Sequence, residues 1–139
     1  MRSPSVFNFW RPGYTPPNSE LAAGGLVAPE LQLATEVSVA GYLNYLRGTW
    51  LTVNASRDIQ LDFSAETAIA DNATALVDRL NLLLMSGQMS TAHRDLVINA
   101  VTSRSIPASN QTSIDTARRE RVFIAILLTM ASPDYLVQK

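Results

Sequence analysis

The side chains best suited to acid–base chemistry are one histidine and a short run of carboxylates. His93 is the only histidine, and Asp58, Asp62 and Glu66 follow one another at short spacing. A histidine can act as a general base, and neighbouring carboxylates can exchange protons or bind a hard cation such as Ca²⁺. However, no second histidine accompanies His93, and the acidic run lacks the glycine and the terminal glutamate of an EF-hand loop. We therefore expect His93 to be a solvated surface histidine and the three carboxylates to have structural or solvated roles, and we expect no catalytic and no metal-binding residue.

Several other kinds of site are excluded by residues and motifs that the sequence lacks. There is no cysteine, which removes disulfides, thiolate metal sites and cysteine nucleophiles. The glycines form neither a dinucleotide-binding pattern nor a Walker loop, and no G-x-S-x-G elbow is present. We expect no cofactor.

The charge balance argues against a nucleic-acid partner. Eleven basic and twelve acidic residues give a net charge of −1, whereas phosphate backbones are gripped by clustered positive charge. The turn at 87–90 joins two predicted helices as in a helix-turn-helix, but the second helix offers Arg94 next to Asp95. DNA readout normally needs more positive charge on that helix.

A membrane-spanning segment is not expected either. The longest strongly apolar run, residues 122–128, is far shorter than the ~20 residues that cross a bilayer. No apolar signal region follows the first four residues. The sequence predicts a soluble chain.

An aromatic N-terminal arm, residues 1–18, is the most distinctive feature. Five of its side chains are typical interface anchors, namely Phe7, Phe9, Trp10, Arg11 and Tyr14. Several prolines prevent a regular element there. The arm either docks on a partner, which could be another protein or a second copy, or packs on its own helices, and both readings stay open.

The elements behind the arm are predicted to be helical. Capping residues, glycines and apolar spacing indicate helices over 19–23, 29–48, 71–86, 90–103 and 113–131, with short turns at 64–70 and 132–136. Asn18 or Ser19, Asp71, Ser90, Ser113 and Ser132 are the expected N-caps. The helix over 29–48 is apolar over more than half of its girth, so we expect it to be well buried.

The expected core residues share helical spacing on the three later helices. They are Ala73, Leu76, Val77, Leu80, Leu83, Leu84, Leu96, Val97, Ala100, Val101, Ala117, Phe123 or Ile124, Leu127 and Leu128. Residues 50–63 alternate apolar and polar side chains, and one short hairpin is an option there. The predicted fold is all-α: residues 19–139 form a single compact helical domain of about four to five helices, preceded by the extended arm.

Six segments together resemble the bacterial family called domain of unknown function 1800. They are SPSVFNFWRPGY at 3–14, LVAPELQ at 26–32, VAGYLN at 39–44, LVDRLNLLL at 76–84, GQMS at 87–90 and MASPDYLVQ at 130–138. The resemblance covers essentially the whole chain in order. Because the family has no established activity, the resemblance brings no catalytic residues.

Two functional hypotheses follow from the resemblance. Family members are several times longer and many look exported, so the resemblance implies that this chain corresponds to the C-terminal part of a larger bacterial protein. The first hypothesis is a non-enzymatic structural or protein-interaction module. The alternative is a segment that contributes to the pocket of an enzyme of unknown reaction, in a hydrolase-like context. For that alternative, Asp62, Glu66, Asp78 and His93 would have to converge in one cleft.

Overall fold

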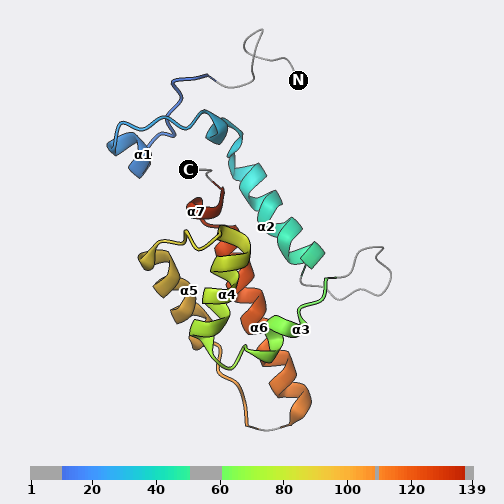
Figure 1. Ribbon diagram of the computed structural model, residues 1–139. Helices are drawn as coiled ribbons and strands as arrows, with labels where there is room; N and C mark the ends of the chain where they lie inside the picture. Colours follow the sequence, from blue (N-terminus) through green and yellow to red (C-terminus); the bar gives the residue numbers. More distant parts are fainter. Residues whose placement is uncertain (1–10, 51–60, 109, 137–139) are drawn as a thin grey trace. The chain divides into compact units, whose positions relative to one another are not determined.

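A computed structural model describes residues 11–50, 61–108 and 110–136 (Figure 1). The chain divides into two compact units, Met1–Asn44 and Tyr45–Lys139, called unit 1 and unit 2 below. Each unit is described by itself. All regular elements of the described residues are helices, which confirms the predicted all-α class. The optional hairpin lies largely outside the described residues, and Leu61 to Phe63, within them, form no strand.

Unit 1 begins with a loop that is hydrogen-bonded to a later segment of the same unit. The amide of Ala28 donates to the carbonyl of Tyr14 at 2.8 Å, and the hydroxyl of Thr15 donates to the carbonyl of Leu26 at 3.2 Å. Between the two segments lies α1 (Glu20–Ala23), where Ser19 accepts a hydrogen bond from the amide of Ala22. Residues 14–28 therefore form a closed loop held at its base.

The helix predicted over 29–48 is in fact two elements. A 3₁₀ helix, η1 (Pro29–Leu33), is followed by α2 (Glu36–Trp50). The break occurs because Thr35 and Ser38 cap the start of α2 reciprocally: the amide of Thr35 donates to Oγ of Ser38 at 2.7 Å, and the amide of Ser38 donates to Oγ1 of Thr35 at 3.2 Å. Gly48 does not end the helix, since glycine inside a helix costs only about 1 kcal/mol.

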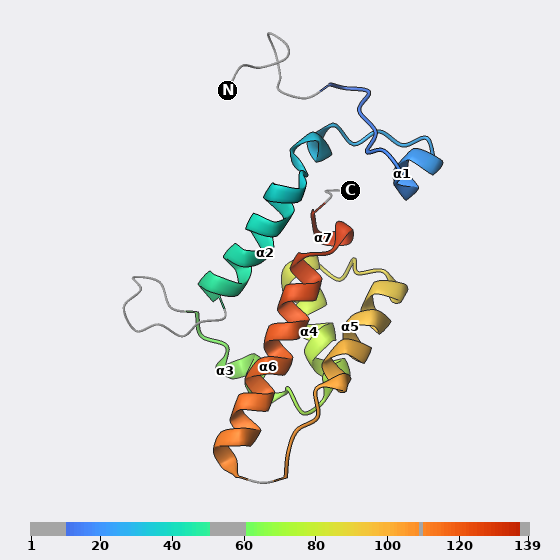
Figure 2. The ribbon, with the colours of Figure 1, turned by 180° about the vertical axis from the view of Figure 1, so that it is seen from behind.

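Unit 2 packs short and long helices around one central helix, α6 (Gln111–Met130). Both views show α4 (Ala73–Met85) and α5 (Thr91–Ser103) beside α6 (Figures 1 and 2). The short helices α3 (Ser64–Ala68) and α7 (Pro133–Leu136) also contact α6. The largest fully buried side chains come from these three long helices: Leu76, Val77, Val97, Val101, Val122 and Thr129. The core of unit 2 therefore lies between α4, α5 and α6.

Two of the predicted caps are displaced by one to three residues. Asn72, not Asp71, caps α4 by accepting from the amide of Ala75, and Asn110, not Ser113, caps α6 by accepting from the amide of Ser113. An asparagine serves as well as an aspartate or a serine at this position, so local sequence could not separate the candidates. The predicted caps Ser90 and Ser132 are confirmed.

Part of the expected core is exposed. Leu83 and Leu96 are 58% and 55% exposed, because α4 and α5 each bury one stripe and these leucines lie outside it. The expectation of a well-buried helix after Pro29 is also wrong, since Val37 is 82% exposed. Within the described residues, no helix is both long enough and apolar enough to cross a membrane.

Candidate functional site

One end of unit 2 gathers arginines and carboxylates from three elements. At its centre is Arg121 on α6, a side chain that is only 8% exposed. Its Nε donates to the carbonyl of Arg104 at 2.8 Å, and Nη1 donates to the carbonyls of Ala70 and Asp71 at 3.1 and 3.2 Å. These carbonyls end α5 and form the turn between α3 and α4. A cation is favourable there because the C-terminal carbonyls of a helix carry partial negative charge.

A second arginine of α6 holds the same turn from outside. Arg118 forms a two-pronged pair with Asp71, Nε to Oδ1 at 2.8 Å and Nη2 to Oδ2 at 2.5 Å. The hydrogen bond from Arg118 holds the pKa of the Asp71 carboxyl below its usual value of 3.8. Asp71 therefore stays charged, so it is suited to binding a cation and not to donating a proton.

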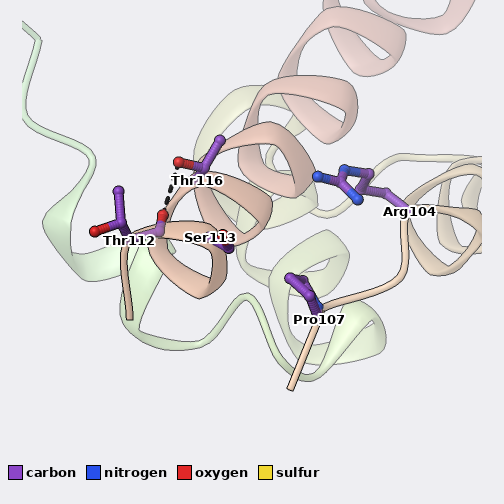
Figure 3. A pocket seen from close by; sticks show the side chains of 5 residues that line it. All are labelled: Arg104, Pro107, Thr112, Ser113 and Thr116. Carbon is purple, nitrogen blue, oxygen red and sulfur yellow. Dashed lines mark hydrogen bonds between the residues drawn. The ribbon is translucent and has the colours of Figure 1, made fainter. Parts of the chain in front are cut away.

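A pocket lies beside this cluster, since Arg104 both lines it and accepts the hydrogen bond from Arg121. It has a volume of about 300 Å³, and its lining is Arg104, Pro107, Thr112, Ser113 and Thr116 (Figure 3). The guanidinium of Arg104 is engaged by the carboxylate of Glu120 and by the carbonyl of Ser105. The hydroxyl of Thr116 donates to the carbonyl of Thr112.

The chemistry of this hollow is limited. Its only charged lining residue, Arg104, already has Glu120 as a counter-ion, which weakens its attraction for an anion. A nucleophilic serine or threonine needs an adjacent base, and neither a histidine nor a carboxylate is among the lining residues. The cluster around Arg121 therefore supports the fold, and its geometry carries no catalytic assignment.

The residues that would have to converge for an enzyme pocket are each engaged separately. Glu66 pairs with Arg79 at 2.7 Å, and Asp78 pairs with Arg94 at 2.6 Å. The hydrogen bond from Arg94 lowers the pKa of Asp78, so this carboxyl also stays charged. Both pairs tie neighbouring helices of unit 2 to one another.

The two remaining candidates for an enzyme pocket are Asp62 and His93. Asp62 is exposed, and it accepts a hydrogen bond from the amide of Ser64 at 2.9 Å, which lowers its pKa. His93 is half-buried and its Nε2 atom is fully covered, so the expectation of a solvated histidine is wrong. Asp58 lies outside the described residues. In the described part of the chain, no three side chains of His, Asp or Glu are grouped so that they could hold a metal ion.

Two of the five arm residues fall within the described residues. Arg11 and Tyr14 close a turn, in which the amide of Tyr14 donates to the carbonyl of Arg11 at 3.0 Å. The carbonyl of Arg11 also accepts from the side chain of Gln32 at 3.4 Å. Phe7, Phe9 and Trp10 lie outside the described residues. Within unit 1, the end of the arm is thus linked to η1 through the bond between Gln32 and Arg11.

Unit 1 carries an exposed apolar set that sequence reasoning missed. It consists of Leu26, Val27, Val37 and Val39, which are 57%, 58%, 82% and 50% exposed. In contrast, Ala28 is the one buried apolar side chain recorded between residues 11 and 44 of the described chain. The apolar spacing over 29–48 predicted one helix that is apolar over more than half of its girth, so it concealed the break between η1 and α2 and led us to expect burial.

Comparison with known proteins identifies a family but no activity. The model of the family described as "Protein of unknown function (DUF1800)" matches residues 1–137. Neither a curated protein nor a solved structure matches the chain.

Proposed function

The chain belongs to the DUF1800 family, and we propose that it is a structural or protein-interaction module forming the C-terminal part of a larger bacterial protein. The single observation that carries the proposal is the exposed apolar set of unit 1. Large apolar side chains that stay exposed outside a packed core are found in regions that bind another protein surface. In this proposal unit 2 has a packed core of its own, and unit 1 presents the surface to be covered.

The arm, residues 1–18, belongs to the same surface in this proposal. Phe7, Phe9 and Trp10 would add large aromatic side chains next to Arg11 and Tyr14, and aromatic and arginine side chains dominate binding energy at interfaces. The turn at Arg11–Tyr14 and its bond to Gln32 attach the arm to unit 1. The natural occupant is the upstream part of the larger protein, or a second copy when the chain is alone.

The ion pairs formed by the arginines of unit 2 support the proposal. Arg79, Arg94, Arg104 and Arg118 each pair with a carboxylate inside the unit. These pairs hold the helices of unit 2 together, and the proposal therefore assigns recognition to the apolar set of unit 1.

Light scattering coupled to size-exclusion chromatography, over a range of concentrations, tests this proposal. We expect the purified chain to associate as its concentration rises, because a second copy then covers the apolar set. Val37→Ser, Phe9→Ser and Trp10→Ser should weaken the association. Leu96→Ser removes a leucine of unit 2 that is 55% exposed, and it is the matched control that should leave association unchanged. A monomer at every concentration would contradict the proposal.

A further inference from the structure

The short helix α7 has little buried surface to hold it on unit 2. None of its four residues is buried, and Leu136 at its end is 49% exposed. A helix of this length does not persist in water without tertiary contacts. Because buried apolar side chains do not supply those contacts, polar contacts must contribute much of what keeps α7 in place.

One polar contact reaches α7 from a distant part of the chain. The amide and the hydroxyl of Ser90, the N-cap of α5, donate to Oδ2 of Asp134 at 3.3 and 2.7 Å. A carboxylate is favoured at this place because the N-terminus of a helix carries partial positive charge. The hydroxyl of Ser90 also accepts from the amide of His93, so one side chain both caps α5 and binds α7.

The turn that leads into Ser90 has supports of its own. Oδ1 of Asn81 on α4 accepts from the amide of Met89 at 3.0 Å, and the carbonyl of Asn81 accepts from the amide of Gly87 at 3.0 Å. Neither bond involves α7. The α5 side of the contact is therefore held whether or not Asp134 is bound, and α7 is the partner that can move.

The chain before α7 is anchored to α6 as far as Ser132. This residue is only 5% exposed, and its hydroxyl donates to the carbonyl of Thr129 at 2.7 Å. Pro133, the first residue of α7, is exposed. A movement of α7 would therefore begin between Ser132 and Pro133 and leave the end of α6 in place.

We propose that α7 is a strap, which is closed while Asp134 binds the N-terminus of α5 and unwinds when this contact breaks. Elements with few buried side chains and solvent-exposed hydrogen bonds open at a lower free energy than the core around them. Both bonds from Ser90 to Asp134 are exposed. Opening the strap leaves the core between α4, α5 and α6 packed. This inference does not depend on the proposed interaction function.

Amide hydrogen exchange, followed by nuclear magnetic resonance, tests the strap. The amides of Tyr135 and Leu136 donate to Ser132 when α7 is formed, so their protection factors report its opening. Asp134→Ala removes the carboxylate and should lower these protection factors roughly three- to tenfold, the range expected for an exposed, charged hydrogen-bonded contact. Asp134→Asn keeps an oxygen acceptor without the charge and should lower them less.

A second variant opens the strap from the α5 side. Ser90→Asp keeps a side chain that can cap α5 but places a negative charge against Asp134, so α7 should lose protection while α5 keeps it. Asn72→Asp makes the matching change at the cap of α4 and is the control that should leave α7 unchanged. Unchanged protection of α7 in both Asp134→Ala and Ser90→Asp would overturn the proposal. An equal loss of protection in α4, α5 and α6 would also overturn it, because α7 would then open only with the core.

Discussion

Arg121 donates a hydrogen bond from Nε to the backbone carbonyl of Arg104 at 2.8 Å, and this bond ties the central helix of unit 2 to the end of α5. The same guanidinium reaches the carbonyls of Ala70 and Asp71 in the turn before α4. One side chain therefore connects three of the helices that enclose the core. A buried guanidinium is suited to this because its fork of donors can serve several carbonyls at once.

Replacement of Arg121 by methionine should destabilise unit 2 strongly. Three carbonyls would lose their donor in a partly to fully buried site, so we expect a loss of about 2–4 kcal/mol in the free energy of unfolding. Arg121→Lys should recover part of this at most, because a lysine cannot form the fork. Urea unfolding followed by circular dichroism measures the loss. Arg119→Met, an exposed neighbour on α6, is the control, and equal losses in the two methionine variants would argue against the role of Arg121.

The cap of α6 can be tested by comparing two alanine variants. Asn110→Ala removes the side chain that accepts from the amide of Ser113 at 2.8 Å, and should cost about 1 kcal/mol of stability. Ser113→Ala removes the residue that the sequence pattern favoured as the cap, and should cost much less. Thermal unfolding of both variants decides between them. A larger loss for Ser113→Ala would contradict the cap seen in the structure.

The end of α4 contains a serine in a conformation that suits glycine. Ser86 has φ of 53°, in the left-handed region, and is followed by Gly87 at φ of 79°. A residue with a Cβ atom is disfavoured there by roughly 1 kcal/mol. Ser86→Gly should therefore raise the melting temperature, and Gly87→Ala should lower it. A lower melting temperature for Ser86→Gly would show that the serine side chain contributes more than its backbone costs.

The acid sensitivity of unit 2 should depend in part on Asp71. Arg118 holds the pKa of Asp71 below 3.8 in the folded chain, so the pair contributes stability above that pH. The contribution is lost as the pH falls through the lower, folded-state pKa. Asp71→Asn should therefore be less stable than the wild type near neutral pH, and the difference should shrink in acid. Because the pair is largely exposed, high salt should also shrink it. A constant difference down to strongly acidic pH would contradict this origin.

The class of the fold and the positions of several helix ends could be predicted from the sequence. Some helix ends after residue 64 follow local signals, because serine caps and the Ser86–Gly87 turn act through adjacent backbone groups. Ser90 and Ser132 cap as predicted for this reason. The family assignment was also accessible, since segments spread over the whole chain carry it.

Contacts between distant residues were not accessible from the sequence. The pairs Arg118–Asp71 and Arg94–Asp78 join positions that only tertiary packing brings together. The reciprocal cap of Thr35 and Ser38 divided an apparently continuous apolar pattern into η1 and α2. The burial expected for that pattern was consequently wrong, and the exposed apolar set of unit 1 became visible only in the structure.

The most direct test of the interaction proposal is amide hydrogen exchange of the purified chain at the lowest and highest concentrations that it tolerates. Residues 26–39 contain the exposed apolar set, so their amides should exchange more slowly at high concentration, when a second copy covers them. The amides of α4, α5 and α6 should exchange equally at both concentrations, because the core of unit 2 is already formed. Slower exchange confined to α4–α6, or no change anywhere, would contradict the assignment of the interaction surface to unit 1.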